Sequence, residues 1–332
     1  MRYFGSKTLA LEQVFHLVAE RIPSGTFCDP FGGIGTVGSY FKQKEYLVTS
    51  GDVLSFAHAY QIARIVQNRL PEFTRLKSAL HLSSSIDVMH HLNELRPISS
   101  WLTREYALNR HFFTVENAMR IDACRRAITR WRRAGLLSPG ENALLVSSLV
   151  DSMDKVANTA GTYYAYLKSW YRKAKRPFNF SFLSPTPGLS GCRALLMDAE
   201  ALVAQCKVDI LYLDPPYNQR SYARYYHLPE SISLGVTPAV FGAAGMPQRS
   251  FYMSRFNNPH NAGEALKHLI ASARFKLLVF HYSDDGIIAP TMVRRILRPY
   301  GTIEDFNVTT TGYTNTTGSR TVNHRLYLVT HA

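Results

Sequence analysis

Apolar residues recur along the chain with two different spacings, and each spacing predicts a type of element. Residues 8–21 have the helical spacing, and residues 26–44 read as a short strand, a glycine-rich turn and a helix. A second strand then ends at Asp52 and another helix follows. Strands alternating with helices predict a parallel sheet with right-handed crossovers. The pattern resumes near residue 193, and residues 302–332 read as two strands joined by a turn rich in Gly, Asn and Thr.

The strand pattern stops between these two parts. Residues 70–189 show mostly helical patterns, and residues 96–180 contain fifteen Lys and Arg against six Asp and Glu. The simplest architecture is a catalytic α/β domain of residues 1–69 and 190–332. A basic, mostly helical insertion of residues 70–189 interrupts it.

The composition and charge of the chain narrow the range of expected binding partners. The net charge of +14 over 332 residues suits a polyanion, most often nucleic acid, although a basic enzyme without such a partner is the alternative. The four cysteines form no CxxC pair and the histidines show no zinc spacing, so we expect neither a disulfide framework nor a metal. A reducing cytoplasmic compartment fits. We expect no signal peptide at the amino terminus and no membrane span.

The glycine-rich turn indicates a nucleoside-like cofactor. The sequence GIGTVG from Gly33 matches the dinucleotide fingerprint by spelling, and Asp52 lies at the distance expected of a ribose-binding acid. Asp29, however, precedes the turn and would repel a pyrophosphate. S-adenosylmethionine has no phosphate, and its sulfonium and ammonium groups favour a nearby acid. The alternative is a turn that serves only close packing of strand and helix.

The predicted strand that ends at Leu213 is followed by Asp-Pro-Pro-Tyr, which presents an unusual set of atoms. Asp214 offers a carboxylate. The carbonyl of Pro215 is a second acceptor, and Pro216 has no N–H with which to continue a strand. Tyr217 adds an aromatic face. Two acceptors and a stacking ring suit the exocyclic amino group of a nucleobase flipped out of its duplex.

These motifs together carry a resemblance. DPPY, the upstream DPFGGIG and the amino-terminal RYFGSK resemble the Dam-like adenine-specific DNA methyltransferases. The segments VANTAGTYYAYLK and DPPYNQRSYARYYHLPESI are similar to a branch of that family found in restriction–modification systems. The resemblance implies a Rossmann-like, S-adenosylmethionine-dependent methyltransferase sheet with a helical target-recognition insertion, acting on a flipped adenine in double-stranded DNA.

The resemblance also assigns residues. It implies that Asp214, Pro215, Pro216 and Tyr217 form the catalytic motif. The residues expected at the cofactor are Tyr3, Lys7, Asp29, Phe31, Gly33, Gly35, Asp52, Asp198 and Asp214. The family more often has tryptophan at the position of Tyr3. The alternative for Lys7 is a solvated lysine at a helix start, and for Asp198 an ordinary helix cap.

The insertion supplies candidate DNA contacts. Arg126, Arg130 and Arg133 share one face of a predicted helix and suit a phosphate backbone. Further candidates, from segments that mix aromatic and cationic residues, are Lys168, Arg172, Lys173 and Arg220. A solvated helix face is the alternative, and the sequence does not show which residues read bases.

The leading hypothesis is therefore a site-specific DNA adenine methyltransferase. The aspartate that opens the DPPY motif favours adenine, because the enzymes that methylate the amino group of cytosine more often carry serine there. The alternatives are methylation of cytosine's amino group, methylation of adenine in RNA, and a DNA-binding module whose catalytic site is degenerate. Double-stranded DNA is the expected partner, in a bacterial-type cytoplasm at the nucleoid, and a separately acting restriction endonuclease is a further candidate.

Overall fold

The chain folds into two compact units in this computed structural model, which describes residues 7, 10–248, 251–315 and 318–330 and only the backbone of residues 309–322. The sheet unit is drawn from Gly5–Gln61, Thr186–Ser221 and Tyr252–Ala332, and the helical unit includes Ile62–Pro185 and Tyr222–Phe251. Among the described residues, no helix combines the length and the apolar character needed to cross a membrane.

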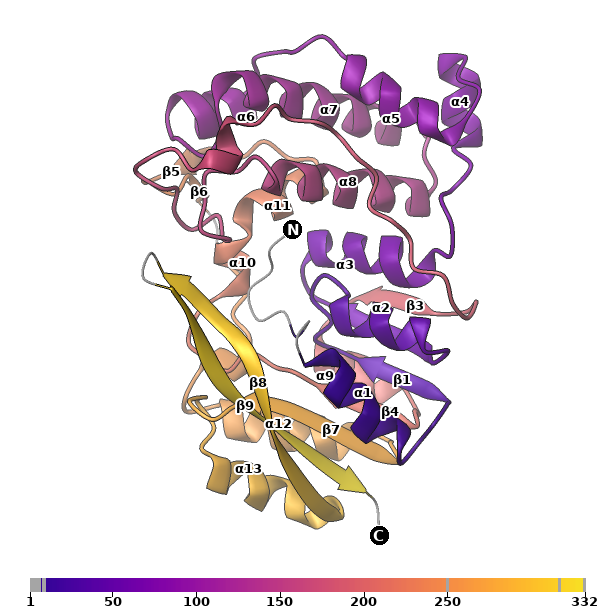
Figure 1. The fold of residues 1–332 in the computed structure, drawn as a ribbon, viewed down its shortest axis with the longest axis vertical. Helices are drawn as coiled ribbons and strands as arrows, with labels where there is room; N and C mark the ends of the chain where they lie inside the picture. The colour runs from indigo at the N-terminus through magenta and orange to yellow at the C-terminus, as the bar shows by residue number, and fades with distance from the viewer. Residues whose placement is uncertain (1–6, 8–9, 249–250, 316–317, 331–332) are drawn as a thin grey trace. The chain divides into compact units, whose positions relative to one another are not determined.

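The sheet unit contains a seven-stranded sheet in the order β3-β2-β1-β4-β7-β9-β8 (Figure 1). The strands are β1 (Thr26–Asp29), β2 (Leu47–Asp52), β3 (Arg193–Leu196), β4 (Ile210–Leu213), β7 (Leu277–Ser283), β8 (Thr302–Asn315) and β9 (Gly318–Thr330). The first five in this order pair in parallel. β9 runs antiparallel to both β7 and β8, and Figure 1 draws β8 and β9 in yellow as a long hairpin. This mostly parallel, Rossmann-like α/β sheet confirms the predicted fold class.

Helices cover both faces of the sheet because its central strands are apolar on both sides. Every residue of β4 and β7 is buried, as expected for strands inside a parallel sheet. Phe27 of β1 stacks on Phe41 with ring centroids 4.0 Å apart, whereas Cys28 packs into the core cluster on the opposite face. The helices of the sheet unit are α1 (Leu11–Ala19), α2 (Thr36–Gln43), α3 (Ser55–Gln61), α9 (Ala199–Gln205), α12 (Ala262–Ser272) and α13 (Pro290–Leu297). Helices α1 and α2 lie on the Phe27 side, and α9, α12 and α13 pack on the other.

One acidic side chain ties the starts of three central strands together. Asp209, just before β4, accepts hydrogen bonds from the Thr26 amide at 2.8 Å and the Thr26 hydroxyl at 2.7 Å. Lys276, just before β7, places Nζ 2.7 Å from the same carboxylate. These bonds lower the pKa of Asp209 to about 2, with Lys276 as the largest contributor. Asp209 therefore helps to set the register of β1, β4 and β7.

The helical unit is built around two long helices. Its α-helices are α4 (Thr74–Leu80), α5 (Ser85–Glu94), α6 (Trp101–Thr103), α7 (Val115–Arg133), α8 (Pro139–Asp154), α10 (Tyr222–Tyr225) and α11 (His227–Leu234). It also contains π-helical turns at Ile62–Val66 and Arg104–Leu108, and a small hairpin of β5 (Val240–Phe241) and β6 (Met246–Pro247). Ser138 and Glu141 form a capping box at the start of α8. Residues 70–189 contain helices and no strand, as their pattern predicts.

The compact units differ from the predicted domains chiefly in Tyr222–Phe251, which packs with the helical unit although the sequence predicts it in the catalytic domain. The boundaries also shift: residues 62–69 belong to the helical unit and residues 186–189 to the sheet unit. The assignment of catalysis to one part and target recognition to the other stays a prediction.

Candidate active site

Three predicted site carboxylates meet at one edge of the sheet. Asp29 is the last residue of β1, Asp52 is the last residue of β2, and Asp214 directly follows β4. Because β1 pairs in parallel with both β2 and β4, the carboxyl ends of the three strands lie at the same edge. Strand order reverses at β1, and open α/β sheets bind ligands at such a point. The topology therefore brings together acids that are distant in the sequence.

Lys7 pairs with the predicted catalytic acid. Its Nζ lies 2.5 Å from Oδ2 of Asp214, and the two side chains are 3% and 17% exposed. Burial raises the pKa of Asp214, and the Lys7 ammonium opposes that rise. Lys7 thus favours an ionised carboxylate in a place where water solvates it poorly. The solvated alternative for Lys7 is wrong, and its contact with the cofactor stays a prediction.

The carboxylate of Asp29 is buried, and only weak contacts stabilise its charged form. It is 1% exposed, and its Oδ1 accepts a long hydrogen bond of 3.3 Å from the amide of Phe31. Burial, followed by the nearby Asp214 carboxylate, raises the pKa of Asp29 to about 8. A cation beside Asp29 would favour its charged form.

The carboxylate of Asp52 organises the glycine turn. Its Oδ2 accepts the Gly33 amide at 3.1 Å, and its Oδ1 accepts the Leu54 amide at 2.9 Å. Gly33 has a φ of 51°, in the left-handed region that favours glycine. Asp52 therefore holds the turn in place, and its bond to a ribose stays a prediction.

Close approach explains a further glycine that the sequence analysis missed. A Cβ on Gly32 would lie 2.1 Å from Oγ of Ser50 and 2.9 Å from Nε2 of Gln61, so another residue would require these two side chains to move. Gly35 has a φ of 75° at the amino end of α2. The ring of Phe31 lies edge-on to Phe256 with centroids 5.3 Å apart. The signal for Gly32 was present as the first of two consecutive glycines.

Asp198 is the N-cap of α9, as the alternative for this residue proposed. Its Oδ1 accepts the Glu200 amide at 2.9 Å. Its Oδ2 accepts the hydroxyl of Tyr252 at 2.6 Å, and Tyr252 is 45% exposed. The sequence analysis missed Tyr252, which lies in a loop without a motif. The contact of Asp198 with a cofactor's adenine stays a prediction.

The DPPY motif forms a corner at the end of β4. Pro215 is buried, and the carbonyl of Tyr217 accepts the amide of Ile287 at 3.0 Å. The rings of Tyr282 and His324 contact the ring of Tyr217. The sequence analysis missed both neighbours. Tyr3, the remaining predicted cofactor residue, lies outside the described residues.

The predicted DNA-binding helix face is exposed. Arg126, Arg130 and Arg133 of α7 all face solvent, and none makes an ion pair or hydrogen bond with another described residue. Two other arginines of α7 are structural. Arg125 is buried and pairs with Asp122 at 3.0 Å, and Arg132 donates to the carbonyls of residues 233 and 234. The helix thus separates structural arginines from solvent-facing ones.

The other predicted DNA contacts are scattered. In the helical unit, Lys168 and Arg172 are exposed, whereas Lys173 donates to the Asp154 carbonyl at 2.8 Å. Arg220 is exposed in the sheet unit. Three aromatic residues near Lys168 are also exposed: Tyr164, Trp170 and Tyr171. Their contact with DNA stays a prediction.

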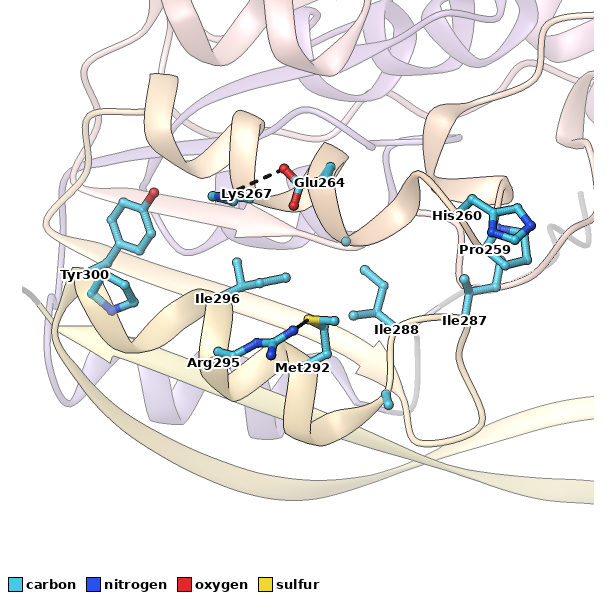
Figure 2. Close-up of a pocket in the computed structure, with 13 residues that line it drawn as sticks. Pro259, His260, Glu264, Lys267, Ile287, Ile288, Met292, Arg295, Ile296 and Tyr300 are labelled. Carbon is cyan, nitrogen blue, oxygen red and sulfur yellow. Dashed lines mark hydrogen bonds and ion pairs between the residues drawn. The ribbon is translucent and has the colours of Figure 1, made fainter.

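A surface cavity of about 630 Å³ lies elsewhere in the sheet unit, between α12 and α13 (Figure 2). Figure 2 shows Glu264 and Lys267 of α12 facing Met292, Arg295 and Ile296 of α13. None of the described residues of the predicted site lines this cavity. The cavity and the acidic sheet edge are therefore different features of the surface.

Comparison with known proteins gives one family. The model of the D12 class N6 adenine-specific DNA methyltransferases matches residues 3–283. The type II methyltransferase M.FokI of Planomicrobium okeanokoites is 33% identical over 93% of this chain and 48% of its own length. The modification methylase StsI of Streptococcus sanguinis is 30% identical over 90% of this chain and 46% of its own. The type II methyltransferase M.NlaIII of Neisseria lactamica is 29% identical over 91% of this chain and 89% of its own. The chain thus spans about half the length of the first two relatives.

Proposed function

The chain belongs to the family of D12 class N6 adenine-specific DNA methyltransferases, and from this premise we propose that it methylates the exocyclic amino group of adenine in duplex DNA with S-adenosylmethionine as cofactor. One observation carries the proposal. Asp214 stands at the end of a buried central strand, paired with the buried Lys7 and followed by Pro-Pro-Tyr.

The acidic edge of the sheet suits this cofactor. S-adenosylmethionine carries a sulfonium and an ammonium, and the carboxylates of Asp29 and Asp52 end two adjacent strands there. A dinucleotide would bring a pyrophosphate beside Asp29, whose charged form would repel it. Asp29 and Asp52 are therefore the residues proposed to hold the cofactor's polar groups. When bound, S-adenosylmethionine supplies the electrophilic methyl group.

The corner residues suit the adenine amino group. Its nitrogen lone pair is delocalised into the ring and is a poor nucleophile. Hydrogen bonds from its two protons to Asp214 and the Pro215 carbonyl would localise the lone pair, and the Asp214 carboxylate would stabilise the positive charge that develops on nitrogen. The Lys7 ammonium opposes the rise in the pKa of Asp214 that burial causes, and so favours the carboxylate form. Tyr217 would stack on the base, which must leave the duplex to reach the corner.

The exposed arginines of the helical unit suit the phosphate backbone of the DNA duplex. Arg126, Arg130 and Arg133 form a cationic face without internal partners among the described residues, and phosphate contacts from such a face position a duplex without reading its sequence. M.FokI and M.NlaIII are named type II methyltransferases. By analogy, we propose a modification role, with any partner restriction endonuclease acting as a separate protein.

A labelled methyl-transfer assay tests the proposal. The protein is incubated with radiolabelled S-adenosylmethionine and either duplex DNA or RNA, in separate reactions. The product nucleic acid is then digested to nucleosides. N6-methyladenine from DNA is the expected product. Methylated cytosine, methylation of RNA alone, or tight DNA binding without any methylation would each replace the proposal by one of its alternatives. Asp214→Ala serves as the matched inactive control.

A further inference from the structure

The ring of Tyr217 is held from two sides by rings that stand nearly perpendicular to it. The centroid of the His324 ring lies 5.3 Å from that of Tyr217 with an interplanar angle of 83°. The ring of Tyr282 lies 6.4 Å away at 85°. Edge-to-face contacts of this kind orient aromatic rings. Since neither neighbour is parallel to Tyr217, neither imitates the parallel stacking of a base.

His324 packs against His281 of β7, which is hydrogen-bonded to β4, the strand that ends at the corner. The rings of His324 and His281 are 5.2 Å apart at 87°, and His281 Nδ1 lies 2.8 Å from the hydroxyl of Tyr212. Tyr212 belongs to β4, two residues before Asp214. His281 belongs to β7 and His324 to β9, where it pairs in register with Ser283. These contacts therefore link Tyr212 of β4 to His281 of β7 and His281 to His324 of β9. His324 in turn contacts Tyr217, which follows the two prolines.

Tyr212, His281, His324 and Tyr217 form an aromatic brace whose inner side is buried. The side chains of Tyr212, His281 and His324 are at most 2% exposed. His281 Nε2 and His324 Nδ1 are buried without a hydrogen-bond partner among the described residues. A second proton on either ring would therefore place an uncompensated charge in the interior.

The charged groups around the brace reinforce its neutrality. Burial, followed by the nearby Lys7 ammonium, lowers the pKa of His324 to about 3, although the Asp284 carboxylate acts in the opposite direction. Burial, Lys7 and then His324 hold the pKa of His281 well below its usual range. The lowered pKa values favour the neutral form of both imidazoles. Among the described residues, their contacts are ring packing and one hydrogen bond to Tyr212.

We propose that His324 is a positioning residue that sets the plane of the Tyr217 ring for stacking on the flipped base, with Tyr212 and His281 bracing it from behind. This inference rests on the proposed function for the role of Tyr217. The matched family region ends at residue 283, so the family comparison assigns no role to His324.

The ring itself provides a test that requires no DNA. The full chain carries 3-fluorotyrosine at position 217, and its fluorine resonance is recorded between pH 5 and 8. One line that does not titrate is expected in the wild-type background. His324→Ala should shift or broaden that line, His324→Phe should largely preserve it, and His268→Ala on the exposed surface of α12 should leave it unchanged. An identical line in His324→Ala would overturn the proposal, as would a titration near pH 6.5 that disappears with His324.

A coupling experiment then tests the consequence for catalysis. His324→Ala should lower kcat/KM for DNA by roughly 5- to 150-fold, the range of losing one base-stacking contact, with cofactor affinity unchanged. The fluorescence of 2-aminopurine at the target adenine should show less flipped base. In a Tyr217→Ala background the same substitution should cost less than about twofold, because the ring that it positions is gone.

The outcomes separate a positioning role from a structural one. An equal loss in both backgrounds, or a loss that follows thermal stability and is not rescued by His324→Phe, would make His324 a core residue and overturn the proposal. If the wild-type protein methylates no DNA, the proposed function fails, and the fluorine resonance still decides whether His324 positions Tyr217.

Discussion

A carboxylate at the end of a buried strand is expensive to ionise, and the structure offsets that cost at Asp214 with a buried lysine. We therefore predict that Asp214→Asn keeps the fold and the DNA affinity but loses on the order of 10²–10³ in methyl-transfer rate, as for one preorganised charge contact. Asparagine retains one acceptor oxygen and loses the charge that stabilises the nitrogen cation. Single-turnover kinetics with saturating DNA would measure the loss, with circular dichroism as the control for folding. Transfer at the wild-type rate would make the strand-end acid structural.

Asp29 gives a pH dependence of cofactor binding. Its pKa of about 8 means that the free protein holds a proton there below pH 8, and a cationic cofactor favours the ionised form. Affinity for S-adenosylmethionine should therefore rise with pH, by up to about tenfold per unit between pH 6 and 8, and level off above. Titration calorimetry in buffers of different ionisation enthalpy should detect up to about one proton released per cofactor.

Asp29→Asn is the control for that measurement. The cofactor's own amino group also titrates near pH 8, at about the value of an ordinary α-amino group. The difference between wild type and variant isolates Asp29, because asparagine cannot release a proton. Equal proton release and parallel pH profiles in the two proteins would show that Asp29 does not change its protonation when the cofactor binds, and would contradict the prediction.

Local sequence predicted the acidic residues of the site and missed their aromatic neighbours for a physical reason. Asp29, Asp52 and Asp214 each end a strand that is recognisable from its own apolar residues, and parallel pairing then brings the three ends together. His324 reaches the corner only because β9 pairs with β7 in one particular register. A shift of one residue would turn it to the other face, and local pattern does not specify that register.

At the scale of elements, α7 has one solvent-facing cationic row. Replacing Arg126, Arg130 and Arg133 together by glutamine should weaken binding to all DNA sequences alike. It should also reduce the slope of log affinity against log salt by about 0.9 for each lost phosphate contact. The matched control replaces three exposed cations of the sheet unit, Lys267, Arg295 and Arg298. Equal slopes in the two triple variants would mean that the α7 face is merely solvated, and an altered sequence preference would make these arginines base readers.

The bonds of Asp209 at the starts of β1, β4 and β7 predict a loss of stability in acid. Its folded pKa of about 2 lies below the ordinary value, so its contribution is present above about pH 4 and is lost as pH falls towards 2. Because the carboxylate is 23% exposed, we discount the shift and expect Asp209→Asn to lower the unfolding free energy by on the order of 1 kcal/mol at pH 7. Urea unfolding at pH 7 and pH 3 should show the difference shrinking in acid. A constant difference would assign the effect to packing instead.

The helices and strands were predictable where the spacing of apolar residues and the positions of glycine and proline indicate the same boundaries. The strand after Lys276 and the one before the two prolines appear where their apolar runs predict them, and the two final strands pair as far as Asn315 and Gly318. The placement of Tyr222–Phe251 in the helical unit was not predictable, because it depends on contacts with distant residues. The amide of Tyr163, for example, donates to the Tyr225 carbonyl at 2.8 Å.

At the scale of the whole molecule, charge and chemistry are divided between the units. The chain carries a net +14, and the α7 arginines belong to the helical unit, whereas the Lys7–Asp214 pair and the other site carboxylates belong to the sheet unit. Defects in the two units should therefore affect different steps of one reaction. Under the proposed function, we expect cofactor binding and transfer to depend on the sheet edge, and the capture of DNA to depend mainly on the exposed cations.

This division predicts additive defects in a combined variant. Asp214→Asn should lower the single-turnover rate with little change in DNA affinity, and the α7 triple variant should lower DNA affinity with little change in that rate at saturating DNA. Since the two sets belong to different compact units, we expect their free-energy changes in kcat/KM to add within about 0.5 kcal/mol. Measuring all four proteins at one salt concentration gives the coupling energy directly. A coupling above about 1 kcal/mol would mean that the α7 arginines help to place the base at Asp214, and that recognition and chemistry are not separate in this protein.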